Sequence, residues 1–318
     1  MLERNESALF SNADKISPTA QLIAGCRELN YDKVAEAIKR GADVNAKSPC
    51  TIDGSYIYNN QHTWYTPLSL VAKQSHGITD AHEIFIKICA IAELLLNNEA
   101  NLDALDKGDM GNSPLHWAIV TLNKKLCKLF ISHAINKKSD LLNQPNQPEE
   151  EYFGINTPLI LALKVSCRSL LLDGFYDLEV AELLIKNGAD INAINYYKQS
   201  ALHWASILRL PEKFFDLLIT NGAEHRPDKF NNDPIKLYKT QITYKMIDYS
   251  SAPTSFRDID YHLPCWYDSN DIRLPYRQSF INQRNDISQP HILQLLESNK
   301  QMQKNSDPEP KSSYDLSY

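Results

Sequence analysis

The sequence predicts an all-α fold, a solenoid of helix-turn-helix units with β-hairpin tips, enlarged loops and an irregular C-terminal cap. Three observations support this prediction. A Thr/Ser-Pro-Leu motif recurs along the chain, a Gly-Ala-Asp motif recurs between its copies, and an amphipathic run precedes the second motif. Such self-similarity is typical of repeat architectures, in which each unit buries its apolar side against the next.

The Thr/Ser-Pro-Leu motif marks where the first helix of each unit is expected to begin. The hydroxyl group can accept hydrogen bonds from free backbone N–H groups, and Pro at the first helical position lacks an N–H that would be unpaired anyway. The motif occurs at 66–68, 113–115 and 157–159, with variants at 200–202 and 233–235.

The second helix of each unit is predicted by apolar residues at helical spacing. Gly41, Gly188 and Gly222 directly follow three of these runs, where a left-handed residue can end a helix, and Glu99 takes the fourth place. The predicted order is therefore turn, helix, helix, hairpin. The runs cover residues 34–40, 91–98, 180–187 and 214–221.

With these motifs the chain resembles the ankyrin-repeat family, whose pattern runs T-P-L-H-x-A, then V-V-x-L-L, then G-A-D-V-N. The tetrapeptide Leu-His-Trp-Ala, which carries the His of this pattern, occurs twice, at 115–118 and 202–205. The 33 residues from Ala201 to Pro234 equal the family period, whereas earlier units are longer. The extra residues are expected in loops at 48–65, 73–88, 136–155 and 164–178.

The expected organisation has four parts. Residues 1–16 form an N-terminal extension, and 17–246 form repeats one to five with the start of a sixth. Residues 247–299 hold an irregular insertion and a C-terminal capping helix, which would cover the open end of the stack. The polar segment 300–318 is expected to be a disordered tail.

The resemblance implies a protein-protein interaction module that binds another protein through its concave groove and hairpin tips. His116 and His203 are expected to bond turn backbone and tie adjacent units together. Trp117 and Trp204 have two open interpretations, internal packing or contact with the partner. The other aromatic candidates for partner binding lie on tips and enlarged hairpins, at Trp64, Tyr65, Tyr152, Phe153, Tyr196, Tyr197 and Phe230.

Composition argues against other classes of partner and site. The net charge of −6 favours neither nucleic acid nor an anionic membrane, and no apolar run is long enough to insert into a bilayer. Six scattered cysteines suit a reducing, cytoplasmic location. No Walker loop, GxGxxG or HExxH motif is present, so we expect no catalytic residue, metal or cofactor and a non-enzymatic protein. We also expect the protein to be a monomer.

Two alternatives accompany this interpretation. Cys265 and His262 lie close together in the insertion, so residues 247–288 could form a small cysteine-dependent catalytic appendage on an ankyrin scaffold. The A/T-rich coding composition, the eukaryote-like repeats and the polar tail raise a second alternative, which concerns location. The protein would then be an effector that a bacterium secretes into the cytosol of a host cell.

Overall fold

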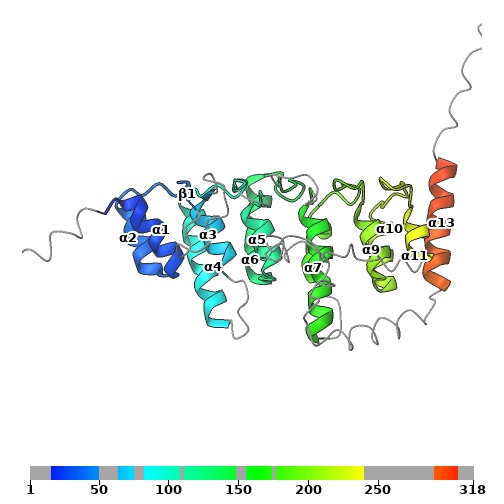
Figure 1. Ribbon diagram of the computed structural model, residues 1–318, viewed down its shortest axis with the longest axis horizontal. Coiled ribbons are helices and arrows are strands. Elements are labelled where there is room, and N and C mark those ends of the chain that lie inside the picture. The colour runs from blue at the N-terminus through cyan, green and yellow to red at the C-terminus, as the bar shows by residue number, and fades with distance from the viewer. Residues whose placement is uncertain are drawn as a thin grey trace, which may run out of the picture.

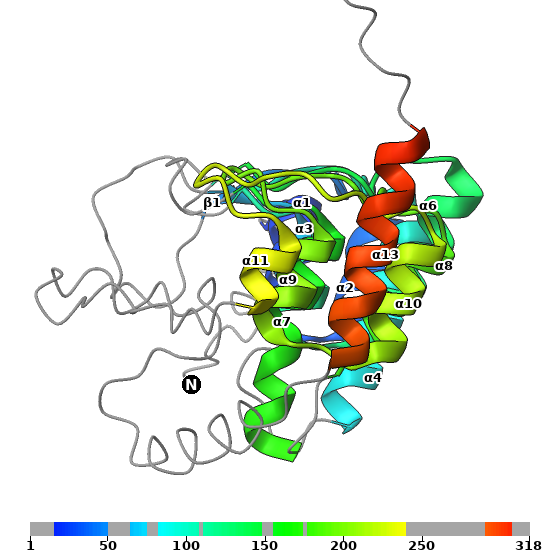
Figure 2. The ribbon, with the colours of Figure 1, turned by 90° about the vertical axis from the view of Figure 1, so that its right-hand side faces the viewer.

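The computed structural model describes residues 16–49, 64–74, 82–107, 111–147, 155–173, 177–239 and 290–306. The helices stand in two parallel rows, with loops along one edge (Figures 1 and 2). The inner row is α1 (Pro18–Glu28), α3 (Pro67–Lys73), α5 (Pro114–Val120), α7 (Pro158–Asp173), α9 (Ala201–Leu208) and α11 (Pro234–Lys239). The outer row is α2 (Tyr31–Lys39), α4 (His82–Asn97), α6 (Lys124–Lys137), α8 (Glu179–Lys186), α10 (Glu212–Thr220) and α13 (Pro290–Ser306). The all-α prediction is confirmed.

The inner helices begin where the recurring motif predicts. Thr66 caps α3 by accepting from the Ser69 backbone N–H at 3.2 Å, and Pro67 occupies the first turn. Ser113 and His116 form a reciprocal capping box at the start of α5. Ser17 caps α1 by accepting from the Ala20 backbone N–H at 3.2 Å, ahead of Pro18. The capping prediction is confirmed because each hydroxyl satisfies a backbone donor that the helix leaves free.

The ends of the outer helices also follow the prediction. Gly41, Gly188 and Gly222 have φ values of 85°, 88° and 86°, which place them in the left-handed region. Glu99 adopts φ 65° at the equivalent place after α4, although it carries a side chain. The motif thus keeps its backbone geometry even where glycine is replaced.

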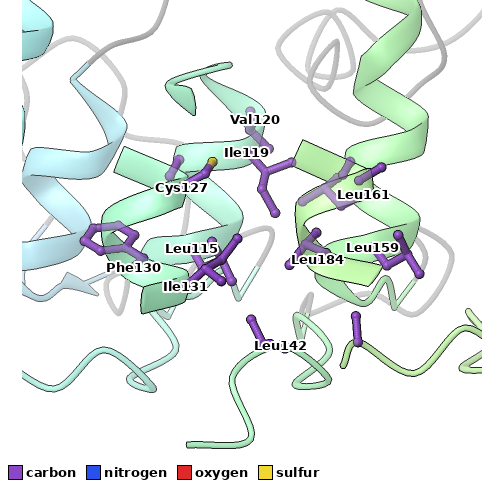
Figure 3. Close-up of a cluster of buried hydrophobic side chains, with 14 of the residues drawn as sticks. Leu115, Ile119, Val120, Cys127, Phe130, Ile131, Leu142, Leu159, Leu161 and Leu184 are labelled. Carbon is purple, nitrogen blue, oxygen red and sulfur yellow. The ribbon is translucent and has the colours of Figure 1, made fainter. Parts of the chain in front are cut away.

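Apolar side chains from both rows form one continuous core. Leu115 and Ile119 of α5 lie between α6, which contributes Cys127, Phe130 and Ile131, and the next unit (Figure 3). Neighbouring inner helices contact one another along the whole row from α1 to α11. Every unit therefore depends on its neighbour for burial of its apolar side.

The extra residues within units are helical to a large extent, which differs from the expected loops at 73–88 and 164–178. Helices α4 and α7 each contain 16 residues, so that α4 already begins at His82 and α7 continues to Asp173. In α4 the added turn carries Ile84 and Phe85, which pack against the core. In α4, apolar burial therefore extends the helix beyond the length of the repeat pattern.

The hairpins contain little regular strand in the described part of the chain. β1 (Ser48–Pro49) pairs antiparallel with β2 (Trp64–Tyr65), and Trp64 makes a further bridge to Lys107 in the next tip.

Helix α13 occupies the outer position after α11 and contacts both α10 and α11 (Figure 2). It continues to Ser306, whereas the sequence pattern predicted that the ordered chain ends at residue 299. Polar contacts explain the extra length, because Gln303 donates to the Ala223 carbonyl at 2.7 Å and accepts from the His225 backbone N–H at 3.0 Å.

Candidate functional site

The hairpin tips overhang one side of the inner row (Figure 2). We call this side the inner face, made of α3, α5, α7 and α9 with the tip residues 47–48, 64–65, 104–107, 195–199 and 228–232. The positions of its side chains follow from how each tip closes.

In the described part of the chain, four of the tips are closed by the same pair of contacts at the neck. Asp106 donates its backbone N–H to the Asn112 carbonyl and accepts the Asn112 N–H on its side chain, both at 2.9 Å. Asn195 and Gln199 repeat both contacts at 3.0 and 2.9 Å. Side-chain closure of this kind is typical of Asx turns. The other two necks are Asn146 with Asn156 and Asp228 with Asn232.

Adjacent tips are joined by backbone hydrogen bonds. Trp64 and Lys107 exchange two bonds at 2.8 and 3.0 Å, and the Lys229 N–H donates to the Tyr197 carbonyl at 2.9 Å. The Gln147 N–H bonds to Gly111 O at 2.9 Å, and a Cβ at Gly111 would lie 1.9 Å from Gln147 O. Only glycine allows this approach, so the tips are held side by side along the array.

The C-terminal tips form an aromatic cluster. Tyr197 stacks on Phe230 of the next tip with ring centroids 6.0 Å apart, and Tyr196 meets Tyr197 edge to face at 5.3 Å. The Lys229 ammonium lies 4.0 Å from the Tyr196 ring centroid. Phe230 is 60% exposed, while the two tyrosines are half-buried. The structure thus brings three of the predicted partner-binding residues together, with a large apolar ring facing solvent.

The N-terminal tips carry a second aromatic cluster. Trp64 is half-buried with the Lys47 ammonium 4.3 Å from its centroid, whereas Tyr65 is buried and meets Trp117 edge to face at 6.2 Å. Lys73 lies 4.6 Å from the Tyr65 ring centroid and donates to its hydroxyl at 2.9 Å. Tyr65 therefore links the tip to the inner row and offers little surface to a partner.

The two repeated tryptophans are buried. Trp117 is 6% and Trp204 7% exposed. The Trp117 indole N–H donates to Asp106 Oδ2 at 2.5 Å, while the buried Trp204 indole N–H has no hydrogen-bond partner among the described residues. Of the two open interpretations, internal packing accounts for most of each ring.

The two histidines act at the starts of helices, as predicted. Each places Nδ1 near the N-cap hydroxyl, at 2.7 Å for His116 and 2.9 Å for His203. His116 Nε2 also contacts the Asn156 carbonyl of the next unit at 3.3 Å. The predicted tie between units is confirmed for His116. Burial lowers the pKa of His116 to about 4, so the ring is neutral.

The described thiols are unsuited to nucleophilic chemistry. Cys26 and Cys127 are buried, and burial raises the pKa of each thiol well above its ordinary value. Burial also raises the pKa of Cys89. Among the described residues, no group of three or more His, Cys, Asp or Glu side chains is placed to hold a metal ion.

Several predicted residues lie outside the described ranges. These are Tyr152 and Phe153 of the enlarged hairpin, and Cys265 and His262 with the whole of 247–288. In the described part of the chain no helix is both long and apolar enough to cross a membrane.

Comparison with known proteins bears on the repeat. A family model described as "Ankyrin repeat" matches residues 156–196, which span α7, α8 and the tip at Asn195. The chain therefore contains an ankyrin repeat. Ankyrin repeats are protein-protein interaction modules, and the array described above has that architecture.

The ankyrin-repeat chain is similar to curated proteins named neurogenic locus notch homolog. It is 27% identical to notch homolog protein 1 of Xenopus laevis over 189 residues, which is 59% of this chain and 6% of that protein. It is 33% identical to notch homolog protein 2 of Homo sapiens over 125 residues, which is 39% of this chain and 4% of that protein. The chain thus spans only a small part of the length of these relatives.

The lysines that cover the aromatic rings of the ankyrin array were not identified from the sequence. Lys47, Lys73, Lys164 and Lys229 each lie within about 5 Å of a predicted aromatic ring. A signal was available: Lys73 and Lys164 both stand six residues after the motif proline, at Pro67 and Pro158.

Proposed function

We propose that this protein binds a protein partner through the inner face and the hairpin tips of its ankyrin array. The supporting observation is the aromatic cluster of the C-terminal tips, where Phe230 remains 60% exposed on a tip that backbone bonds hold in place. A rigid, exposed aromatic ring beside half-buried tyrosines is typical of a binding hot spot.

The test compares capture of partners by wild type and by tip variants. Tyr196→Ala with Phe230→Ala removes the cluster and should abolish crosslinked capture of the partner from native or host lysates. Circular dichroism should remain helical, because both side chains lie on the surface of the tips. Exposed Ile135, on outer helix α6, gives the control Ile135→Ala, which should capture as wild type does.

A tip variant that captures the same proteins as wild type would show that the cluster is not the binding surface. Equal loss with Ile135→Ala would show that capture is a nonspecific apolar effect.

The expected location and the catalytic alternative stay predictions. Cytoplasmic residence and secretion into a host cell are both compatible with a binding module, and fractionation of the native cells would separate them. For the proposed cysteine-dependent appendage, a thiol-reactive probe gives the direct test. Cys265 reacting no faster than a free peptide thiol would argue against it.

A further inference from the structure

Helix α13 is held in place by two kinds of contact along its length. Its first half places Ile292 and Leu296 in the common core, where both side chains are fully buried. The C-terminal end of the helix lies at the edge of the array that carries the loops (Figure 1). From Asn299 onward, polar side chains meet the last hairpin, which we define as residues 223–233. The two halves of α13 therefore depend on different interactions.

Two side chains of the second half bind the last hairpin directly. Gln303 accepts from the His225 backbone N–H at 3.0 Å. Lys300 pairs with Asp233, which also caps α11 by accepting from the Lys236 backbone N–H at 2.8 Å. The ion pair between Lys300 and Asp233 thus fixes this half of α13 to the start of α11.

The imidazole of His225 lies among these contacts. The residue is half-buried, and both of its ring nitrogens are closed to solvent. On the α13 side the ring interacts with Asn299 and with the charge of Lys300. Asp233, before α11, and His203, on α9, act on the ring from the array. A positive charge on this ring would therefore act on the ion pair that holds α13.

We propose that His225 is an acid-sensitive switch that releases the second half of α13 from the last hairpin. While the ring is neutral, Asp233 pairs with Lys300. Protonation places a second cation beside Lys300, and the two cations compete for the Asp233 carboxylate. Release moves Lys300 into water and leaves Asp233 to His225. This inference goes beyond the proposed function and does not rest on it.

The charges around this imidazole keep it neutral as long as α13 is docked. Lys300 and His203 both oppose a positive charge on the ring, whereas Asp233 favours one. Asp233 already serves Lys300. Glu224 and Arg226, the charged neighbours within the hairpin, pair with each other and so add little net charge.

The direction of the pH effect follows from the pKa of His225 in the two states. Burial, together with the Lys300 charge, lowers the pKa of docked His225 to about 4, against an ordinary value of 6.5. In the released state the ring is hydrated and Lys300 is distant, so the pKa returns toward 6.5. The released form therefore binds the proton more tightly, and docking weakens as the pH falls from about 6.5 toward 4.

Asp233 keeps its charge over most of this range. Burial acts against the carboxylate, but the hydrogen bond from Lys300 lowers the pKa of Asp233 below its ordinary value of 3.8. Acidification to about pH 5 thus changes the charge of the histidine and not that of its carboxylate neighbour.

The histidine on α13 itself acts in the opposite direction. His291 Nε2 lies 2.9 Å from a carboxylate oxygen of Glu212 on α10, so protonation turns this contact into an ion pair. Ile292 and Leu296, next to it in the first half, carry no charge. Acid should therefore loosen the second half of α13 while the first half stays in place.

The experiment measures hydrogen exchange of the full chain by mass spectrometry at about pH 7 and about pH 5. Exchange times are scaled for the pH dependence of intrinsic amide exchange, and electron-transfer fragmentation separates residues 290–298 from 299–306. On acidification, wild type should lose about tenfold more protection in 299–306 than His225→Gln, which has no charge to gain. The two proteins share every other histidine, so an acid effect on the whole array cancels in this comparison.

Two variants of α13 serve as controls. His291→Gln removes the other histidine near this end and should keep the wild-type response in 299–306. Lys304→Gln removes an exposed lysine one turn after Lys300 and should keep it as well.

A second measurement decides the case in which His225→Gln is already unprotected in 299–306 at pH 7. NMR titration of the ring gives the pKa of His225 directly, and the spectrum of His225→Gln identifies its signal. Loss of the neighbouring cation in Lys300→Gln should raise this pKa by about one pH unit. Lys304→Gln should leave it unchanged.

An equal loss of protection in wild type and His225→Gln would overturn the inference, because the acid response would then come from another group. Equal release of residues 290–298 would do so too, since α13 would then leave as one unit. A His225 pKa that is the same in wild type and Lys300→Gln would show that the two side chains do not compete, and the switch would be wrong.

Discussion

At the scale of single residues, the repeat histidines are buried, neutral hydrogen-bonding groups. His116 is fully buried, contacts Ser113 and reaches across to Asn156. Its pKa is lowered to about 4, against an ordinary value of 6.5, mainly by burial. Between these two pH values the unfolded chain binds more protons than the folded chain, so acidification through this range favours unfolding.

This linkage gives the first prediction. The stability that depends on neutral His116 is fully present above about pH 6.5 and is lost as the pH falls toward 4, with a total of about 3 kcal/mol. The measurement is the free energy of unfolding in urea for wild type and His116→Gln, from about pH 7 to about pH 4.5. The variant should be the less stable protein at neutral pH, and the gap should narrow on acidification.

Because burial also lowers the pKa of His203 and His225, only the difference between the two proteins isolates His116. Parallel stability curves for the two proteins would contradict this role.

The sequence alone was informative for residues whose role is local. The caps Thr66 and Ser113 and the left-handed glycines follow from backbone chemistry within a few residues, and the structure confirms them. The lysine-tryptophan pairs join residues some forty positions apart, such as Lys164 and Trp204. Their contact depends on the stacking of units, which residue chemistry alone did not indicate.

At the scale of elements, the tips keep one backbone conformation with different residues. Lys198 and Asn231 stand where the family pattern has glycine, and both adopt positive φ, 57° and 59°. A left-handed conformation is costly for a residue with an ordinary side chain and easier for Asn. The tip geometry is thus imposed by the neck contacts at some cost in backbone strain.

The second prediction tests this strain. Lys198→Gly should raise the free energy of unfolding by about 0.5–1 kcal/mol, since glycine removes the Cβ penalty at positive φ but has a more flexible unfolded state. Lys198→Ala keeps the Cβ and should give no gain. Urea unfolding of both variants and of Asn231→Gly gives the comparison. A gain in Asn231→Gly as large as that in Lys198→Gly would show that strain is not the cause.

The lengths of the elements were harder to predict than their existence. The second-helix runs at 180–187 and 214–221 lie within one or two residues of α8 and α10. Helices α4 and α7, by contrast, extend into segments expected to be loops. The repeat pattern specifies the shared part of each unit, while the extra turn of α4 depends on the packing of Ile84 and Phe85 against the core.

At the scale of the whole molecule, α13 closes the C-terminal end of the array. Ile292 and Leu296 on this helix are fully buried and join the common core. Lys239 of α11 adds an ion pair to Glu297 at 2.6 Å, although such an exposed pair contributes little. In an array where units contact only their neighbours, loss of a cap should act locally.

The third prediction follows from this architecture. Ile292→Ala with Leu296→Ala should destabilise the C-terminal end by several kcal/mol, about 2–5 for each side chain removed. Hydrogen exchange measured by mass spectrometry should accelerate in α9 and α10 and stay unchanged in α3 to α6. The control is Met302→Ala, because Met302 lies on the same helix and is 62% exposed. Uniform acceleration along the chain would show that the array unfolds as one cooperative unit.

The neck contacts of the tips have a consequence for how such a chain can diversify. The same two bonds close a loop of few residues between Asn195 and Gln199 and a longer one between Asn146 and Asn156. What lies beyond the neck can therefore lengthen or be replaced while the helices below keep their register. A foreign loop could therefore be grafted beyond a neck. Such a chain can acquire a new binding specificity while its stacked helices stay unchanged.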